Sequence, residues 1–286
     1  MQLHKEIDET LLTADLDVHL EGLDFTYKGS TNSVLDSLSI DIKGPQLVSI
    51  LGPNGAGKST LIHCMNKILE PTGGTVMVNG KNVEDITVKE MAKISSYVPY
   101  TSTDSFPLTV VDTILMGRHP HAKWGSIKDD LEIVHEALQL LDIEDLADSM
   151  FNELSAGQHQ KVMLARGFAQ EPRILFLDEP TSNLDIKYQL EITRILRRMS
   201  REKKVLVIMI SHDINIAAKY SDNIIVLHNH KIHSVGTPEE VITSEMLKEV
   251  YDVDAKITMD NGKPHLVLCD DCTYEPLPED SGVYLP

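Results

Sequence analysis

The distribution of apolar residues along the chain predicts an α/β protein in which short strands alternate with helices. Apolar runs of strand length recur, some alternate with period two, and others are followed by apolar residues at helical spacing. The expected strands are 18–27, 34–42, 47–51, 75–78, 95–98, 174–177, 205–210, 224–227 and 232–235. The expected helices are 61–69, 186–201, a short one from Pro238, and 243–250. The order of strand, helix and strand over 174–210 indicates a parallel sheet.

A longer helical region lies between the strands expected at 95–98 and 174–177. Apolar residues recur at helical spacing from Thr109 to about Leu146. Ser155 can then cap a further helix that continues through Ala169. We interpret this region as a helical insertion into the α/β domain.

The segment Gly52-Pro53-Asn54-Gly55-Ala56-Gly57-Lys58-Ser59-Thr60 has the spacing of a phosphate-binding loop. It follows an apolar strand and precedes a helix, which is the context that this motif requires. Backbone N–H groups of the glycine loop and the positive end of the helix dipole would face an anion. Lys58 would contact the β- and γ-phosphates of a nucleotide, and Ser59 would offer its hydroxyl to Mg²⁺. The complete spacing disfavours the alternative of a glycine-rich turn without a ligand. The expected binding residues of the loop are Asn54, Gly55, Gly57, Lys58, Ser59 and Thr60.

Two carboxylates follow the apolar run at 174–177 and supply the remaining chemistry of phosphoryl transfer to water. Asp178 would hold Mg²⁺ through water, and Glu179 would act as general base. Adjacent strand residues point in opposite directions along the pleat, so we expect Glu179 to face the γ-phosphate. The alternative is a pair of strand-end acids that cap the following segment.

Two further side chains could contact the nucleotide, and each also has an ordinary structural interpretation. His212 follows the strand expected at 205–210 and could face the γ-phosphate, or it could be an ordinary strand-end histidine. Tyr27 could stack on adenine with its hydroxyl in water, or it could be a sheet aromatic.

Composition and charge limit the classes of function. The chain has 286 residues, 42% of them hydrophobic, and a formal net charge of −18, which argues against a surface for duplex nucleic acid. No signal peptide is expected at its start, and no apolar run approaches the length of a spanning helix. Three cysteines fit a reducing compartment, so we expect a cytoplasmic protein whose membrane role requires a partner. For the Cys269–Cys272 pair, a surface tail is a better interpretation than a metal site.

Taken in order, these motifs resemble those of the nucleotide-binding subunits of ATP-binding cassette transporters. The segment 52–59 is similar to the first nucleotide motif of that family, and 174–179 is similar to the second. Leu154 to Gln158 looks like the signature sequence, with Ala156 where a second glycine is more usual. The segment 182–185 resembles the loop that crosses the dimer interface, and His212 resembles the switch histidine.

The resemblance implies a P-loop NTPase (RecA-like) core with a mixed sheet, an antiparallel β subdomain and an inserted helical subdomain. The resemblance covers residues 18–257, and the helical subdomain is expected at about 101–165. An N-terminal extension at 1–17 and a C-terminal extension at 258–286, expected to be partly mobile, lie outside it. It also implies that a homodimer encloses two ATP molecules with Mg²⁺. In that dimer, each ATP bound by Lys58 of one subunit would also be contacted by the other subunit. The contacting residues would be Ser155, Gly157, Gln158 and Asp185. We take the signature segment as more than a helix cap, since a cap needs Ser155 but not Gly157 and Gln158.

One position departs from the family pattern. The family normally has a glutamine at the end of the strand before the helical insertion, where this chain has Tyr100. A phenol offers one hydrogen-bonding group where a carboxamide offers two. We therefore hypothesise weaker metal contact and altered coupling to the membrane partner.

Within the family, segments 106–110, 116–120, 236–240 and 251–255 look like those of ferric-siderophore, haem and cobalamin importers. This resemblance implies a peripheral ATPase at the cytoplasmic face of the membrane, bound to transmembrane permease subunits and linked indirectly to an extracytoplasmic substrate-binding protein. Residues 100–118 would hold a coupling helix of the permease. The alternatives are a soluble cassette ATPase that acts on nucleic acid or ribosomes, and a regulatory ATP-binding subunit with weak hydrolysis.

Overall fold

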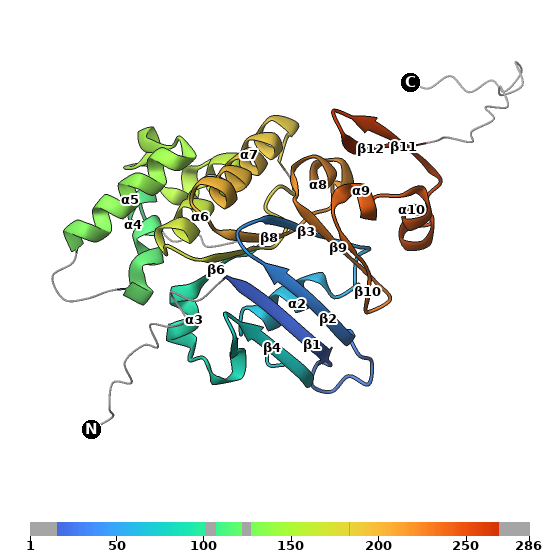
Figure 1. The fold of residues 1–286 in the computed structure, drawn as a ribbon. Coiled ribbons are helices and arrows are strands. Elements are labelled where there is room, and N and C mark those ends of the chain that lie inside the picture. Colours follow the sequence, from blue (N-terminus) through green and yellow to red (C-terminus); the bar gives the residue numbers. More distant parts are fainter. Residues whose placement is uncertain (1–15, 101–106, 122–126, 183, 269–286) are drawn as a thin grey trace, which may run out of the picture.

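The computed structural model describes residues 16–100, 107–121, 127–182 and 184–268. The expectations about residues 1–15, Phe106, Asn183 and the Cys269–Cys272 pair lie outside these ranges. The described chain forms two sheets, a separate hairpin, and helices that cover the sheets (Figure 1).

A mixed sheet forms the centre of the molecule, with strand order β10-β9-β3-β8-β7-β6. Neighbouring strands are parallel except for β10, which pairs antiparallel with β9. The predicted strands and the parallel pairing are thus confirmed, since helical crossovers allow parallel pairing and helices then cover both faces of the sheet. The strands are β3 (Leu47–Leu51), β6 (Ser95–Val98), β7 (Ile174–Leu177), β8 (Leu206–Ile210), β9 (Asn223–His228) and β10 (Lys231–Gly236).

The second sheet is antiparallel, with order β2-β1-β4-β5, and confirms the expected β subdomain. Its strands are β1 (Asp17–Phe25), β2 (Leu35–Lys43), β4 (Gly73–Val78) and β5 (Lys81–Asn82). β1 alternates between buried and less buried positions, which explains the period-two pattern of its sequence. β1 ends before Tyr27, although the expected strand included this residue.

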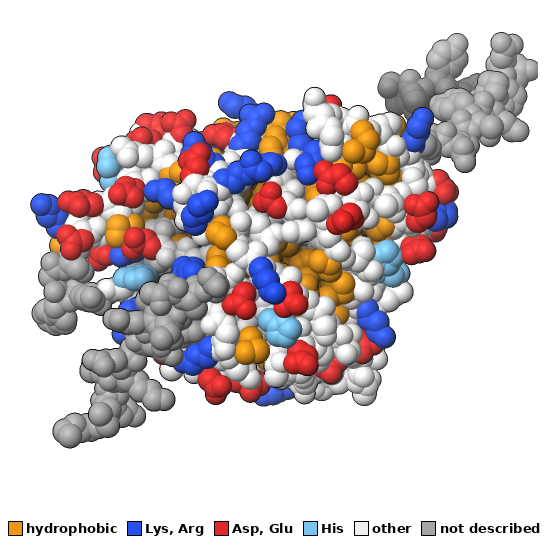
Figure 2. Space-filling model, viewed as in Figure 1, with side chains coloured by type: hydrophobic (Ala, Val, Ile, Leu, Met, Phe, Trp, Pro, Cys, Tyr) orange, Lys and Arg blue, Asp and Glu red, His pale blue; other side chains and the backbone are white. Residues whose placement is uncertain are grey.

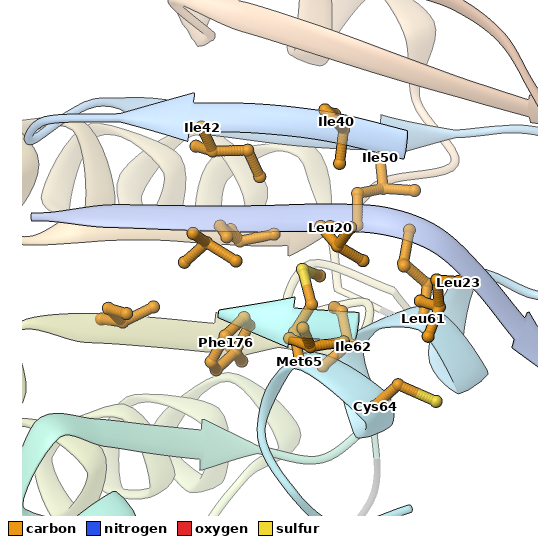
Figure 3. Packing of buried hydrophobic residues seen from close by; sticks show 14 of the residues in the cluster. Leu20, Leu23, Ile40, Ile42, Ile50, Leu61, Ile62, Cys64, Met65 and Phe176 are labelled. Carbon is orange, nitrogen blue, oxygen red and sulfur yellow. The ribbon is translucent and has the colours of Figure 1, made fainter. Parts of the chain in front are cut away.

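Both faces of the central sheet are covered, and successive residues of a strand enter different cores. Phe176 of β7 packs with the antiparallel sheet and α2 (Lys58–Met65), as Figure 3 shows. Its neighbours Leu175 and Leu177 pack on the opposite face, with helices α4 to α7. A third core joins β9 to α8, α9 and α10. Because the central strands are apolar on both faces, their position between two layers is fixed.

The expected helical insertion contains α4 (Val110–Leu115), η2 (Met116–His121), α5 (Ile127–Leu141), η3 (Glu144–Leu146), η4 (Phe151–Glu153) and α6 (Ala156–Ala169). Between α4 and α5 the described chain forms the 3₁₀ segment η2, which contains Pro120; proline removes a backbone donor and clashes with the preceding turn. The expected helix at 61–69 ends at Met65. Lys67 takes a left-handed conformation there, and the N–H groups of Ile68 and Leu69 donate to the His63 carbonyl.

The remaining helices are α3 (Val88–Ile94), α7 (Ile186–Glu202), α8 (Ile214–Tyr220), α9 (Pro238–Val241) and α10 (Ser244–Tyr251), with the 3₁₀ turn η1 (Val83–Asp85). The sequence interpretation missed α3 and α8. Each had a signal, because Thr87 and Glu90 form a capping box before α3 and Asp213 caps α8.

A C-terminal hairpin packs on the domain. β11 (Ala255–Asp260) and β12 (Lys263–Leu268) pair with each other, and the side chain of Asn215 in α8 bonds both the N–H and the carbonyl of Leu266. The expected boundary between residues 257 and 258 falls inside β11.

The overall negative charge is not spread evenly over the surface. Figure 2 shows acidic and basic side chains interspersed on one face, with Lys and Arg gathered along the rim where α7 lies in Figure 1. Within the residues described, no helix has the length and apolarity needed to cross a bilayer.

Candidate functional site

The glycine loop at 52–57 connects β3 to α2, and two of its glycines are required by close contacts. Gly52 has φ +144°, and a Cβ there would lie 2.2 Å from the Leu227 carbonyl oxygen of β9. Gly57 has φ +98°, and its Cβ would lie 2.7 Å from the Val34 carbonyl oxygen. Larger residues would displace the loop from the sheet. The tip, Asn54 and Gly55, is exposed.

Lys58 begins α2 and turns its ammonium back into the loop. Its Nζ donates to the carbonyl oxygens of Gly52 at 2.8 Å and Pro53 at 2.9 Å. Burial lowers the pKa of Lys58, while the negative charges of Glu179 and Asp178 oppose that change. A buried cation beside two carboxylates is an electrostatic arrangement suited to phosphate and metal.

The next residues of α2 and the chain after β1 meet at the edge of the loop. Ser59 is half-buried, and the Thr60 hydroxyl lies 3.2 Å from the Tyr27 hydroxyl. Tyr27 is 46% exposed and packs edge-on against Phe25. Its hydroxyl is thus within hydrogen-bonding distance of Thr60, and its stacking on adenine stays a prediction.

Asp178 follows β7 and is buried, with 8% of its surface exposed. The Tyr97 hydroxyl donates to its Oδ2 at 3.4 Å, and the same hydroxyl lies 3.0 Å from Nε2 of His63. Burial and the Asp178 charge raise the pKa of Tyr97 above its usual range, and burial lowers the pKa of His63. The neutral phenol therefore holds the carboxylate between β6, β7 and α2.

Glu179 lies beside His212, at the ends of β7 and β8. Nε2 of His212 is 2.5 Å from Oε1 of Glu179, and the Ser182 hydroxyl donates to Oε2 at 2.9 Å. The sequence interpretation assumed that the alternation of the pleat sets the direction of Glu179. That assumption is wrong, because Glu179 has φ +50° and is not in strand conformation. It lies past the strand end, where the left-handed turn orients the carboxylate toward His212.

The signature segment forms the N-terminus of α6, away from the glycine loop. Ser155 caps the helix, and the Ser155 N–H donates to Oε1 of Gln158 at 3.0 Å, which completes a capping box. A Cβ on Gly157 would lie 3.0 Å from the Tyr188 ring of α7. The expectation that a helix cap does not need Gln158 is therefore wrong, because Gln158 completes the capping box. Gly157 takes no part in the cap, and its neighbour is the Tyr188 ring.

Asp185 is likewise a helix cap. Its Oδ1 accepts the N–H of Tyr188 at 3.0 Å at the start of α7. Its predicted role at a nucleotide, like those of Ser155, Gly157 and Gln158, stays a prediction.

The structure brings together the glycine loop, Asp178, Glu179 and His212 at the carboxyl ends of β3, β7 and β8, the usual place for ligands in such a sheet. Sequence reasoning missed Tyr97, His63 and Tyr251. Burial raises the pKa of Tyr251 to about 12, against the effect of a hydrogen bond with the Gly52 backbone. Periodicity alone could not find these residues, because their partners are remote in the sequence.

The donor set fits Mg²⁺. Ser59 and Asp178 offer oxygen ligands, and Mg²⁺ usually takes one or two protein oxygens and completes its shell with phosphates and water. The described ranges contain no group of three or more His, Cys, Asp or Glu that could hold a metal.

Comparisons with known proteins agree with this geometry. The family model described as ABC transporter matches residues 35–182. The chain is 44% identical over 248 residues to an uncharacterized ABC transporter ATP-binding protein of Methanocaldococcus jannaschii, covering 87% of this chain and 96% of that one. It is 36% identical to a petrobactin import ATP-binding protein of Bacillus anthracis, with 83% and 88% covered. It is 33% identical to a cobalamin import ATP-binding protein of Halobacterium salinarum, with 88% and 61% covered.

A solved structure has the same architecture. The dimeric structure of a bacterial ABC transporter cassette superposes with a TM-score of 0.69 at 28% identity, and the match covers 77% of this chain and 98% of that one.

Proposed function

This chain belongs to the ABC transporter family as an ATP-binding subunit, and from that premise we propose that it hydrolyses ATP within a homodimer to energise import through a membrane permease. The single observation that carries the proposal is the convergence of Lys58, Asp178 and the Glu179–His212 pair at one edge of the central sheet. These side chains can bind a triphosphate, hold a metal and accept a proton from water.

In this proposal the loop amides and Lys58 bind the β- and γ-phosphates. Ser59 and Asp178 would hold Mg²⁺, which would supply positive charge beside the phosphates. The Glu179 carboxylate accepts the proton of the attacking water through a lone pair that His212 and Ser182 leave available, because each carboxylate oxygen can accept two hydrogen bonds. His212 keeps the carboxylate oriented and can also reach the γ-phosphate. The N-terminus of α6 from the second chain completes the site.

The cargo class we propose is an iron-siderophore, haem or cobalamin-type molecule. The sequence segments noted above support this class, as do the relatives named for petrobactin and cobalamin import. The ATPase would then bind permease subunits at the cytoplasmic face of the membrane and reach a substrate-binding protein only through them. The net charge of −18 and the importer relatives do not favour the nucleic-acid alternative.

The test of the ATPase site is Glu179→Gln. We expect this variant to form a stable dimer in saturating ATP and Mg²⁺, because it keeps the binding contacts while the base is lost. Light scattering after gel filtration would measure the dimer, and phosphate release should fall by about 100-fold or more.

The matched control is Lys58→Ala, which removes the cation from the loop. It should weaken ATP binding and form no dimer. A Glu179→Gln protein that stays monomeric with ATP bound would contradict the proposed site.

A further inference from the structure

We propose that Tyr188 is a positioning residue that fixes the signature segment of α6 to the start of α7, so that both helix ends meet a second chain as one unit. The inference rests on the proposed ATP-dependent dimer, because Ser155 and Asp185 are expected at its interface. Tyr188 itself is not among the residues predicted to contact the nucleotide.

The first contact is between Gly157 and the Tyr188 ring. A Cβ at position 157 would meet three ring carbons, at 3.0, 3.0 and 3.1 Å. Gly157 lies within α6 and takes no left-handed conformation, so a side chain here would be crowded by the ring and not strained by the backbone. Glycine in a helix costs about 0.5–1 kcal/mol relative to alanine, and the close approach of the ring accounts for its presence here.

A second contact lies one turn further along both helices. Nζ of Lys161 is 2.7 Å from Oε1 of Glu191, and the Lys161 side chain is only 8% exposed. Residues 157 and 161 share one face of α6, and residues 188 and 191 share one face of α7, since residues three or four apart are neighbours on a helix. Two contacts on the same pair of faces oppose both rotation and sliding of one helix against the other.

Tyr188 joins this helix contact to the cap of α7. Its backbone N–H donates to Oδ1 of Asp185. Its ring lies against Gly157, which is in the first turn of α6, the turn that Ser155 and Gln158 cap. A displacement of the signature segment must therefore move the start of α7 or break the ring contact. The helical insertion and the segment after β7 are thus connected at the surface that the proposed dimer would bury.

The first experiment is Tyr188→Ala in the Glu179→Gln background. We expect ATP binding to the monomer to be unchanged, because Tyr188 does not touch the glycine loop, while half-maximal dimerisation requires about tenfold more ATP. Tyr188→Phe is the matched control; it keeps the ring and should dimerise like the parent. Binding would be measured with a fluorescent ATP analogue and dimerisation by light scattering.

Dimerisation of Tyr188→Ala at the same ATP concentration as the parent would overturn the inference and leave the proposed function intact. Failure of the Glu179→Gln parent to dimerise would instead overturn the proposed function.

The second experiment tests the ring contact within one chain, without nucleotide. Gly157→Ala should lower the thermal midpoint when Tyr188 is present, because its Cβ meets the ring. In the Tyr188→Ala background the same substitution should cause little further loss, because neighbouring residues that share a contact are not additive. An equal loss in both backgrounds would show that the ring does not constrain position 157, and would overturn the inference.

Discussion

At the scale of single residues, the site depends on buried polar groups that satisfy one another. Lys58 is buried with two backbone carbonyls as partners, and Asp178 is buried with the Tyr97 hydroxyl as partner. An unpaired buried charge would be costly, so these partners fix where each charge lies before any ligand binds. Tyr97 is the neutral member of this group and sets the direction of the Asp178 carboxylate.

We predict that Tyr97→Phe raises the Mg²⁺ concentration needed for half-maximal ATPase activity by about fivefold, the equivalent of one net hydrogen bond of about 1 kcal/mol. The ring and its packing remain, so the thermal midpoint should change little. A Mg²⁺ titration of phosphate release would measure the effect.

The matched control is Tyr220→Phe, which removes the hydroxyl of a buried tyrosine at the end of α8. If Tyr97→Phe and Tyr220→Phe require the same Mg²⁺ concentration as the parent, then Tyr97 does not position Asp178.

At the scale of elements, polar contacts hold the 3₁₀ segment η2 against the C-terminus of α6. Arg118 is buried and donates to Asp130, Glu171 and the Ala169 carbonyl. A ring nitrogen of His121 lies 2.9 Å from the Gln170 carbonyl oxygen, which requires that nitrogen to carry the proton. These contacts compensate for the irregular backbone around Pro120.

The pH dependence of stability should report the His121 contact. Burial, and then the charge of Arg118, lower the pKa of His121 in the folded chain. The unfolded chain binds a proton at about pH 6.5, so between that pH and the lower folded pKa the unfolded state holds more protons. The free energy of unfolding should therefore fall as the pH drops through this window, and level off below it.

We predict that the urea midpoint falls less for His121→Gln than for the parent when the pH drops from about 7.5 to about 5.5. The control is His119→Gln, an exposed neighbour that should keep the slope of the parent. A His121→Gln protein with an unchanged slope would show that this residue does not contribute.

At the scale of the whole molecule, three cores join the two sheets and the surrounding helices, so the site edge is supported from both sides. The phosphate loop is held by β2 and β9, while the signature segment is held by α7. Tyr100 lies two residues past the end of β6 and is 41% exposed.

We predict that Tyr100→Gln lowers the Mg²⁺ requirement of ATP hydrolysis by about fivefold, because a carboxamide adds a hydrogen bond worth about 1 kcal/mol. Hydrolysis stimulated by the permease should also change in membranes that contain the full transporter. Tyr100→Phe separates the ring from its hydroxyl and is the control. If Tyr100→Gln leaves both hydrolysis and transport unchanged, the hypothesis about this position is wrong.

The sequence alone determined the alternation of strands and helices in the α/β core, the glycine loop, the two strand-end carboxylates and His212. These features are encoded locally, because apolar periodicity and motif spacing depend on residues close together in the chain. Two predictions were wrong for the same reason. The helix expected to reach residue 69 ends at Met65, close to the left-handed Lys67. Glu179 was expected in strand conformation and lies in a left-handed turn.

Only the tertiary structure decided which side chains hold these residues in place. Tyr97 meets Asp178 across 81 positions of sequence, and Gly157 meets Tyr188 between two helices. Such contacts arise when separate elements pack together, and neither periodicity nor spacing records the partner. The glycine of the signature segment is thus visible in the sequence, but the ring that would crowd a side chain there is visible only in the folded molecule.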